Sequence, residues 1–265
     1  SMKNLLKLVS LVVVFGFFIS TSGVSARKPA GFSLPAKAVE VSQGVFSLGK
    51  AYNAQSDSFV DGYAIVHKKG NARGGSAKPP KGGTICYGFI ASGAKWKTVE
   101  PWEMFPGAGL SNAFVLNNLT SSIATWENAA GTSNILGAGS LGVGVATDPY
   151  TFDNKNQVSF GELENDTIAV TVVWGRFSGP AFNRELVAWD QVYNTLYEWT
   201  EDALVQPNKM DFWNISIHEL GHSMGLADIY QSTCSGVTMY GFGTEGETKK
   251  RTLEQPDITG ISTLY

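Results

Sequence analysis

One segment constrains this chain more than any other, because it holds two of the three histidines at a spacing of four residues. Residues 217–230 read I-H-E-L-G-H-S-M-G-L-A-D-I-Y. Residues four apart lie on one face of a helix, so His218 and His222 can present an imidazole nitrogen to the same zinc ion. Glu219 is placed to hold a metal-bound water and to take its proton, which is the chemistry of peptide hydrolysis.

A third ligand is expected shortly after the second histidine. Gly225 can end the helix with a positive φ and turn the chain, so that Asp228 comes back toward the metal. A catalytic zinc normally has three protein ligands, and Asp228 would complete the set. His67, the remaining histidine, lies far upstream and reads as an ordinary surface residue. We therefore expect one catalytic zinc with Glu219 as the general base.

The motif and its surroundings resemble a known family. The pattern H-E-x-x-H-x-x-G-x-x-D, followed by Met239 in V-T-M-Y, resembles the metzincin signature and its Met-turn. The stretches D-F-W-N-I-S-I-H-E-L-G-H and L-E-Q-P-D-I-T-G-I-S-T-L-Y are similar to matrixin segments. An aspartate as third ligand is similar to archaeal and bacterial matrixin-like proteins and to the snapalysin group. The likeness covers about residues 86–265.

This resemblance implies both a fold and an activity. The fold would be α+β, a zincin domain with a twisted mixed sheet, an active-site helix, a Met-turn and a C-terminal helix. The activity would be that of a zinc metalloendopeptidase acting on protein or peptide substrates. The cysteine-switch motif of animal matrixins is absent from residues 27–85, so blockade of the zinc by a pro-segment thiol does not carry over.

The same resemblance assigns a substrate-binding strand to residues 167–174. This stretch takes the place of the family's edge strand, whose free backbone groups pair with an extended substrate. Its contact residues would be Ile168, Val170, Val172 and Trp174. An ordinary interior strand is the alternative, because edge status is not visible in a single sequence.

The N-terminus has the pattern of an export signal. Lys3 and Lys7 precede an apolar run over residues 8–19, and small residues follow up to Ala26. We expect a signal peptide over residues 1–26, with Ser1 as an addition before Met2. The mature protein would be secreted and not stably inserted in a membrane, whereas a retained membrane anchor is the alternative.

The rest of the chain divides by composition into three parts. Residues 27–69 form an N-terminal segment or pro-segment, and residues 70–83 form a linker rich in Gly, Pro and Lys. That linker is either an activation hinge open to cutting or a simple spacer. Residues 84–265 would be the catalytic domain.

The cysteine count predicts one disulfide. Cys86 and Cys234 are the only cysteines, and an exported chain usually pairs an even number of them. The alternative is a cysteine that ligates zinc in a latent form.

Periodicity predicts three helices and two neighbouring strands in the main domain. Apolar residues three and four apart predict a helix over residues 110–130, ended by Gly131. A second helix runs from about residue 211 to 224, and a third begins behind Pro256. β-Branched and aromatic residues predict strands over residues 167–174 and 185–193.

Composition and charge narrow the possible partners. The 265 residues include 43% hydrophobic side chains, which fits a globular protein, and the formal net charge of -3 implies no nucleic-acid partner.

A calcium site is a weaker possibility. The spacing of its candidate ligands matches no known calcium-binding loop, so a solvated turn is the simpler interpretation. Its candidates are Asp148, Asp153, Asn154 and Asn156.

A binding or adhesion module with a structural zinc is the competing function. Structural zinc sites typically have four ligands, often thiolates. Only three ligands are found here, and Glu219 is intact, so the catalytic interpretation is favoured.

Overall fold

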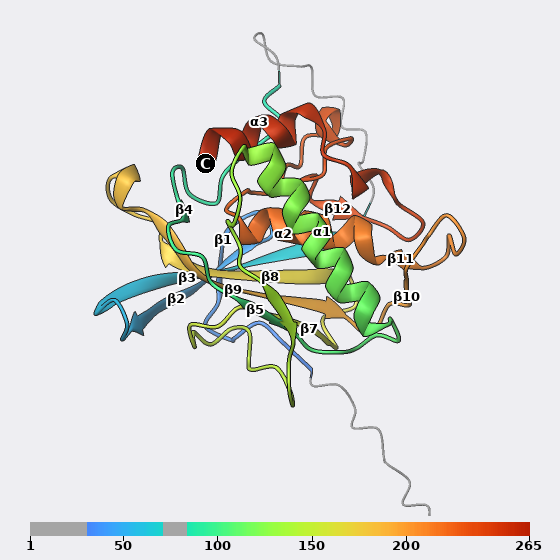
Figure 1. Ribbon diagram of the computed structural model, residues 1–265, viewed down its shortest axis with the longest axis horizontal. Helices are drawn as coiled ribbons and strands as arrows, with labels where there is room; N and C mark the ends of the chain where they lie inside the picture. The colour runs from blue at the N-terminus through green and yellow to red at the C-terminus, as the bar shows by residue number, and fades with distance from the viewer. Residues whose placement is uncertain (1–30, 71–83) are drawn as a thin grey trace, which may run out of the picture.

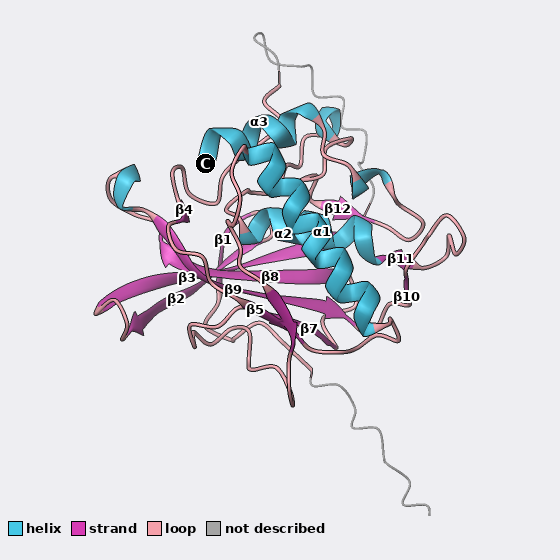
Figure 2. Ribbon diagram, in the orientation of Figure 1, coloured by secondary structure: helices cyan, strands magenta, loops and turns pink. Residues whose placement is uncertain are grey.

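A mixed sheet crosses the molecule, and three helices lie on one of its faces (Figure 1, Figure 2). The computed structural model describes residues 31–70 and 84–265, so the expected signal peptide and nearly all of the expected linker lie outside the described residues. The expected α+β class with a mixed sheet is confirmed. Within the described residues, the helices are too short or too polar to cross a bilayer.

The three predicted helices and the two predicted strands are present, together with further strands that the sequence analysis did not predict. The strands are β1 (Val39–Ser42), β2 (Val45–Asn53), β3 (Ser58–Lys69), β4 (Lys95–Trp96), β5 (Trp102–Met104), β6 (Gly139–Leu141), β7 (Gln157–Gly161), β8 (Thr167–Arg176), β9 (Glu185–Asn194), β10 (Trp199–Thr200), β11 (Met210–Asp211) and β12 (Phe242–Gly243). The helices are α1 (Asn112–Ala130), α2 (Phe212–Ser223) and α3 (Gln255–Leu264), with short 3-10 turns at Ala181–Asn183, Ser232–Cys234 and Lys249–Arg251.

The large sheet has the strand order β1-β2-β3-β8-β9-β7-β5-β6. Neighbours from β1 to β9 are antiparallel, and those from β9 to β6 are parallel. Two short strands join outside this path: β12 pairs parallel with β3, and β4 pairs parallel with β9. Strands β10 and β11 form a separate parallel pair.

Strand β8 lies inside the sheet, which corrects the expected edge position of Ile168, Val170, Val172 and Trp174. It pairs antiparallel with β3 on one side and with β9 on the other. The prediction failed because the pairing partner, β3, comes from residues 58–69, about a hundred positions earlier in the chain. Strand neighbours that distant leave no local trace in the sequence.

The segment before the expected linker is part of this same sheet. Strands β1, β2 and β3 extend it beyond β8, so residues 39–69 are not separate from the main domain in space. The division of the chain into a pro-segment and a catalytic domain remains a prediction.

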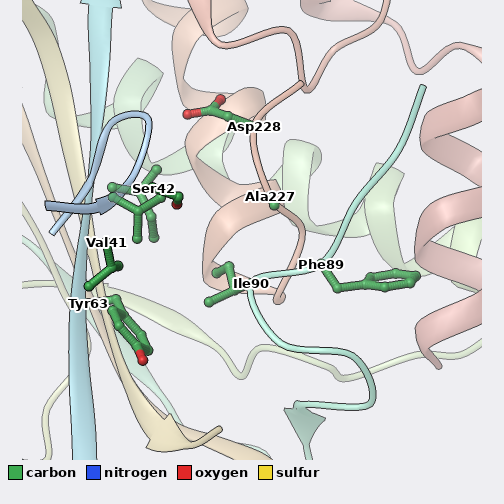
Figure 3. Close-up of a pocket in the computed structure, with 9 residues that line it drawn as sticks. Val41, Ser42, Tyr63, Phe89, Ile90, Ala227 and Asp228 are labelled. Carbon is green, nitrogen blue, oxygen red and sulfur yellow. The ribbon is translucent and has the colours of Figure 1, made fainter. Parts of the chain in front are cut away.

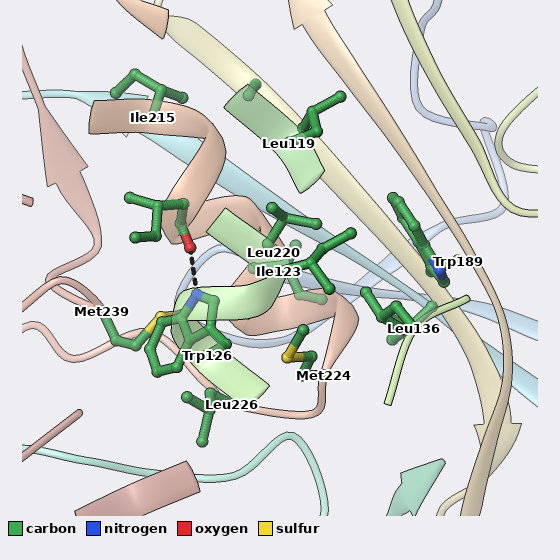
Figure 4. Packing of buried hydrophobic residues seen from close by; sticks show 14 of the residues in the cluster. Leu119, Ile123, Trp126, Leu136, Trp189, Ile215, Leu220, Met224, Leu226 and Met239 are labelled. Carbon is green, nitrogen blue, oxygen red and sulfur yellow. Dashed lines mark hydrogen bonds between the residues drawn. The ribbon is translucent and has the colours of Figure 1, made fainter. Parts of the chain in front are cut away.

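Helix α1 begins and ends where its sequence signals indicate. The Ser111 side chain accepts a hydrogen bond from Phe114 N, which satisfies a free amide of the first turn. Gly131 ends the helix in the left-handed conformation, with φ of 72°. The apolar face of α1 packs on α2, and the Trp126 indole donates a 2.8 Å hydrogen bond to the Ile217 carbonyl (Figure 4).

The predicted disulfide is present. Cys86 and Cys234 are bonded, with their Cα atoms 5.4 Å apart. It links the chain just before β4 to the turn that follows the histidine motif. Both cysteines are therefore used, and no free thiol remains.

Candidate metal centre

Helix α2 carries the histidine motif on its buried face. Asp211 caps its first turn by accepting a hydrogen bond from Asn214 N. The helix ends at Ser223, and Gly225 turns the chain with φ of 103°, as expected. A side chain at Gly225 would also meet the Ala94 carbonyl, so the turn needs glycine for both space and conformation.

Three side-chain atoms converge beyond this turn. The Nε2 atoms of His218 and His222 are 3.1 Å apart. One carboxylate oxygen of Asp228, Oδ1, lies 3.2 Å from the first and 3.4 Å from the second. The structure therefore brings together the three residues that the sequence singled out as ligands.

The protonation states of these three side chains are those that a bound cation requires. His218 Nδ1 lies 2.7 Å from the Thr238 carbonyl, and His222 Nδ1 lies 2.9 Å from the Leu226 carbonyl. A carbonyl can only accept, so each Nδ1 carries the proton and each Nε2 offers a lone pair. Asp228 Oδ1 is buried without a hydrogen-bond donor. Three unshared acceptors this close together need a positive charge between them.

The spacing fits zinc in particular. Zinc binds imidazole nitrogen and carboxylate oxygen at about 2.0–2.1 Å, and the edge of the resulting tetrahedron is about 3.3–3.4 Å. The three separations of 3.1, 3.2 and 3.4 Å match that edge. The donor set of two histidines and one carboxylate is also one that catalytic zinc sites use.

The turn around Met239 packs against α2 and supports the ligand group. A Cβ atom on Gly221 would collide with the Met239 sulfur, so the methionine packs directly against the α2 backbone. Its own amide donates to Asp257 Oδ1 at 3.2 Å, and the Thr238 amide donates to Asp257 Oδ2 at 2.9 Å. Through Thr238, this turn fixes the orientation of the His218 ring.

Both carboxylate oxygens of Glu219 are engaged. Oε2 accepts a 2.6 Å hydrogen bond from the Thr171 hydroxyl on β8. Oε1 lies 2.8 Å from Nδ1 of His67 on β3. Burial raises the pKa of Glu219, and the neighbouring histidines and Thr171 oppose that shift. The carboxylate therefore lies between two strands of the sheet, beside the ligand group.

His67 corrects the expectation of an ordinary surface residue. Its ring is fully buried and lies 4.0 Å, centroid to centroid, from the ring of His218. Burial holds its pKa well below the usual value, so the ring is neutral. Its Nε2 lies 3.2 Å from Nζ of Lys250, which can only donate. The proton of His67 is therefore on Nδ1, and it is donated to Glu219.

Lys250 is a further residue that sequence reasoning missed. It is fully buried, and its ammonium group donates to the carbonyls of Tyr240 and Phe242 at 2.6 and 2.8 Å. Burial lowers its pKa to about 8. Lysine is almost never fully buried, so nothing in its sequence context suggested this position. For His67 a signal did exist, because all three histidines of the chain gather here.

The residues considered for calcium form hydrogen bonds with other parts of the protein. Asp148 accepts from Thr151 Oγ1, and Asp153 accepts from Thr147 Oγ1. The Asn154 amide donates to Gln55 at 2.8 Å, and the Asn156 amide donates to the Pro101 carbonyl at 2.9 Å. These contacts organise the turn between β6 and β7.

Comparison with known proteins relates this geometry to a family. The model of the matrixin family, Peptidase M10, matches residues 138–265, which contain β6 to β9, α2, the Met239 turn and α3. Stromelysin-1 of Equus caballus is 40% identical over 68 residues. That alignment covers 25% of this chain and 13% of the length of stromelysin-1. Strands β1 to β3 and helix α1 lie outside the range that the family model matches.

Proposed function

We propose that this chain, which matches the matrixin family over residues 138–265, is a secreted, zinc-dependent metalloendopeptidase. The observation that carries the proposal is the convergence of His218 Nε2, His222 Nε2 and Asp228 Oδ1 within 3.4 Å of one another. These three atoms would hold the zinc. Proteins and peptides would be the substrates, in keeping with a protease family.

Zinc, when bound, polarises the scissile carbonyl and makes a coordinated water more acidic. The remaining chemistry belongs to the side chains. Glu219 adjoins the first ligand and would take the proton of the attacking water, then pass it to the leaving amine. Thr171 holds one oxygen of that carboxylate, and His67 holds the other. A carboxylate ligand cancels part of the metal charge, so the water is less acidified than with a third histidine.

A disulfide supports the proposed secretion. Cys86 and Cys234 form a bond of the kind that persists in oxidising compartments. The sequence pattern of residues 1–26 adds the export signal that such a protein would need.

The test combines metal analysis with peptide cleavage. The purified chain should contain one zinc per molecule by elemental analysis. Casein or a quenched fluorescent peptide should be cleaved, and a chelator should stop cleavage until zinc is restored. Activity is measured both on the intact chain and on a chain cut between residues 70 and 84. One zinc without cleavage in either form would favour the structural-zinc alternative, and absence of zinc would contradict both.

A further inference from the structure

The pairing of β3 raises the question of how a substrate would reach the site. Strand β3 pairs antiparallel with β8 along most of its length, and on its other side it pairs with β2 and, at Lys68 and Lys69, with β12. At that end it fills a slot between β8 and β12. Because β2 and β3 are joined in the same segment, removing them together would leave free backbone groups on β8 and on β12.

We propose that residues 39–69 are a built-in inhibitor of the enzyme, with strand β3 filling the slot in which an extended substrate would pair with β8. The proposal rests on the proposed peptidase function. An extended substrate would lie antiparallel to β8 and parallel to β12, in the place of β3, and would be held mainly through its backbone.

The first argument is access. His218, Glu219 and His222 are 0% exposed, and the side chain of Asp228 is 2% exposed. A peptide bond cannot approach groups that have no accessible surface. The Glu219 carboxylate lies between Thr171 of β8 and His67 of β3, so β3 covers it on the side opposite β8. On the other side β8 is already paired with β9.

The second argument is the bond that β3 makes to the proposed base. The His67 Nδ1 proton is donated to Glu219 Oε1 at 2.8 Å, and Thr171 donates to Oε2, so the two strands hold both oxygens of the carboxylate and reduce its capacity to act as a base. Lys250 holds the other side of the ring through Nε2. The block therefore acts on the base. It needs no thiol, and both cysteines of the chain are used in the disulfide.

The third argument is the packing between residues 31–70 and the remainder of the molecule. A cavity of about 160 Å³ lies between Val41, Tyr63 and Ile65 on one side and Phe89, Ile90 and Asp228 on the other (Figure 3). A second pocket of about 280 Å³ is lined by Phe46 and Val66 together with Tyr150 and Leu163. Both pockets open to solvent, so clefts mark this junction at two places.

The fourth argument concerns how residues 31–70 are covalently connected to the rest of the protein. The chain leaves β3 at residue 70 and re-enters the described structure at residue 84, ahead of Cys86. One cut between these points would leave residues 31–70 attached by non-covalent contacts alone.

The experiment uses the full chain with a recognition sequence for a site-specific protease placed between residues 70 and 84. Peptide cleavage, hydrogen exchange of the β8 amides and elution in gel filtration are measured before and after cutting. We expect the N-terminal fragment to separate, the β8 amides to exchange faster and kcat/KM to rise at least about tenfold, as when a competent state below about 10% becomes dominant. A synthetic peptide of residues 39–69 should reverse all three changes.

A point variant tests the same idea without cutting. A Cβ on Gly62 would overlap the Trp174 ring, so Gly62→Ala should push β3 away from β8. Uncut Gly62→Ala should cleave peptide faster than the wild type. Phe59→Ser is the matched control on the same strand, because Phe59 is 64% exposed, and it should behave as the wild type.

Two results would overturn the inference. One is a cut chain that keeps residues 31–70 bound and its β8 amides protected under conditions where the site holds zinc. The other is a separated fragment with no gain in cleavage by a chain that was already active. A fragment that separates and exposes β8, without cleavage in either form, would support the inhibitor-like arrangement and contradict the proposed peptidase function instead.

Discussion

Strand β8 has a neighbouring strand on each side, and the two sides differ in what lies against them. Both β3 and β9 form long antiparallel ladders with it. On the β9 side, Trp189 and Tyr193 are fully buried in a continuous core, and Gln191 donates to Ser223 of α2. On the β3 side, Ala64 and Ile65 are fully buried as well, but two pockets open to solvent border this strand, and the outermost strand exposes Val39. A strand can therefore share buried side chains with the core and still border open clefts.

The largest expected effect is the loss of peptide cleavage when the proposed base on α2 is replaced. This loss should be the same whether or not β3 is still attached. Glu219→Gln should retain zinc and lower peptide cleavage by about 10²- to 10⁴-fold, because the amide cannot accept the proton of water. Cutting between residues 70 and 84 should not restore it. Steady-state kinetics and elemental analysis of cut and uncut protein measure this. Full activity in the cut variant would remove Glu219 from the proposed mechanism.

The next effect concerns the third ligand. Asp228→Ala should weaken zinc binding by at least about 100-fold, since even outer-shell partners are worth 10- to 100-fold. Asp228→His should keep the metal and part of the activity, because imidazole supplies the same coordination. Zinc competition titrations with a fluorescent chelator give both affinities. Equal affinity in the alanine variant and the wild type would contradict a ligand role.

Two truncations of fully buried side chains sharpen the comparison of packing. Leu220→Ala, in the α2 core, should lower the free energy of unfolding by about 3–5 kcal/mol. Ile65→Ala, on β3, should cost about 2 kcal/mol, because this buried side chain also lines an open pocket where water can replace the atoms that are removed. Denaturant unfolding of the uncut chain measures both. Equal losses would mean that the β3 side is packed as tightly as the core.

The smallest effect lies at the far end of the same hairpin. The Lys50–Asp61 ion pair joins β2 to β3, with the lysine side chain 64% exposed. Lys50→Ala should therefore change stability by no more than about 1 kcal/mol and leave cleavage unchanged. Thermal unfolding and the peptide assay at two salt concentrations check this. A large effect would show that this hairpin is anchored by charge, in conflict with anchoring through β8 and β12.

The sequence predicted what depends on neighbouring residues. Ser111 and Gly131 marked the ends of α1, and the four-residue spacing of His218 and His222 placed both on one face of α2. Gly225 and Asp228 could be assigned because the turn between them is short. Cys86 and Cys234 could be paired because no other partner existed.

What the sequence did not predict depends on distant pairing and on burial of charge. The position of β3 beside β8 joins residues about a hundred apart, and such contacts have no periodic signal. His67 and Lys250 were missed for the same reason, because each reaches the site only through a strand or turn placed by the fold. The misplaced edge strand follows from this omission, since β8 would be an edge if β3 were absent.

The disulfide gives the chain the topology of a closed ring with two tails. The ring runs from Cys86 to Cys234, the first tail contains β1 to β3, and the second contains Met239 and α3. A single break within the ring opens it but frees no piece, because the sulfur bridge still joins both parts. A single break in the first tail frees a piece that bears no metal ligand. On a non-reducing gel, proteolysis that shortens this protein in one step would therefore report removal of a tail, while nicks in the ring become visible only after reduction.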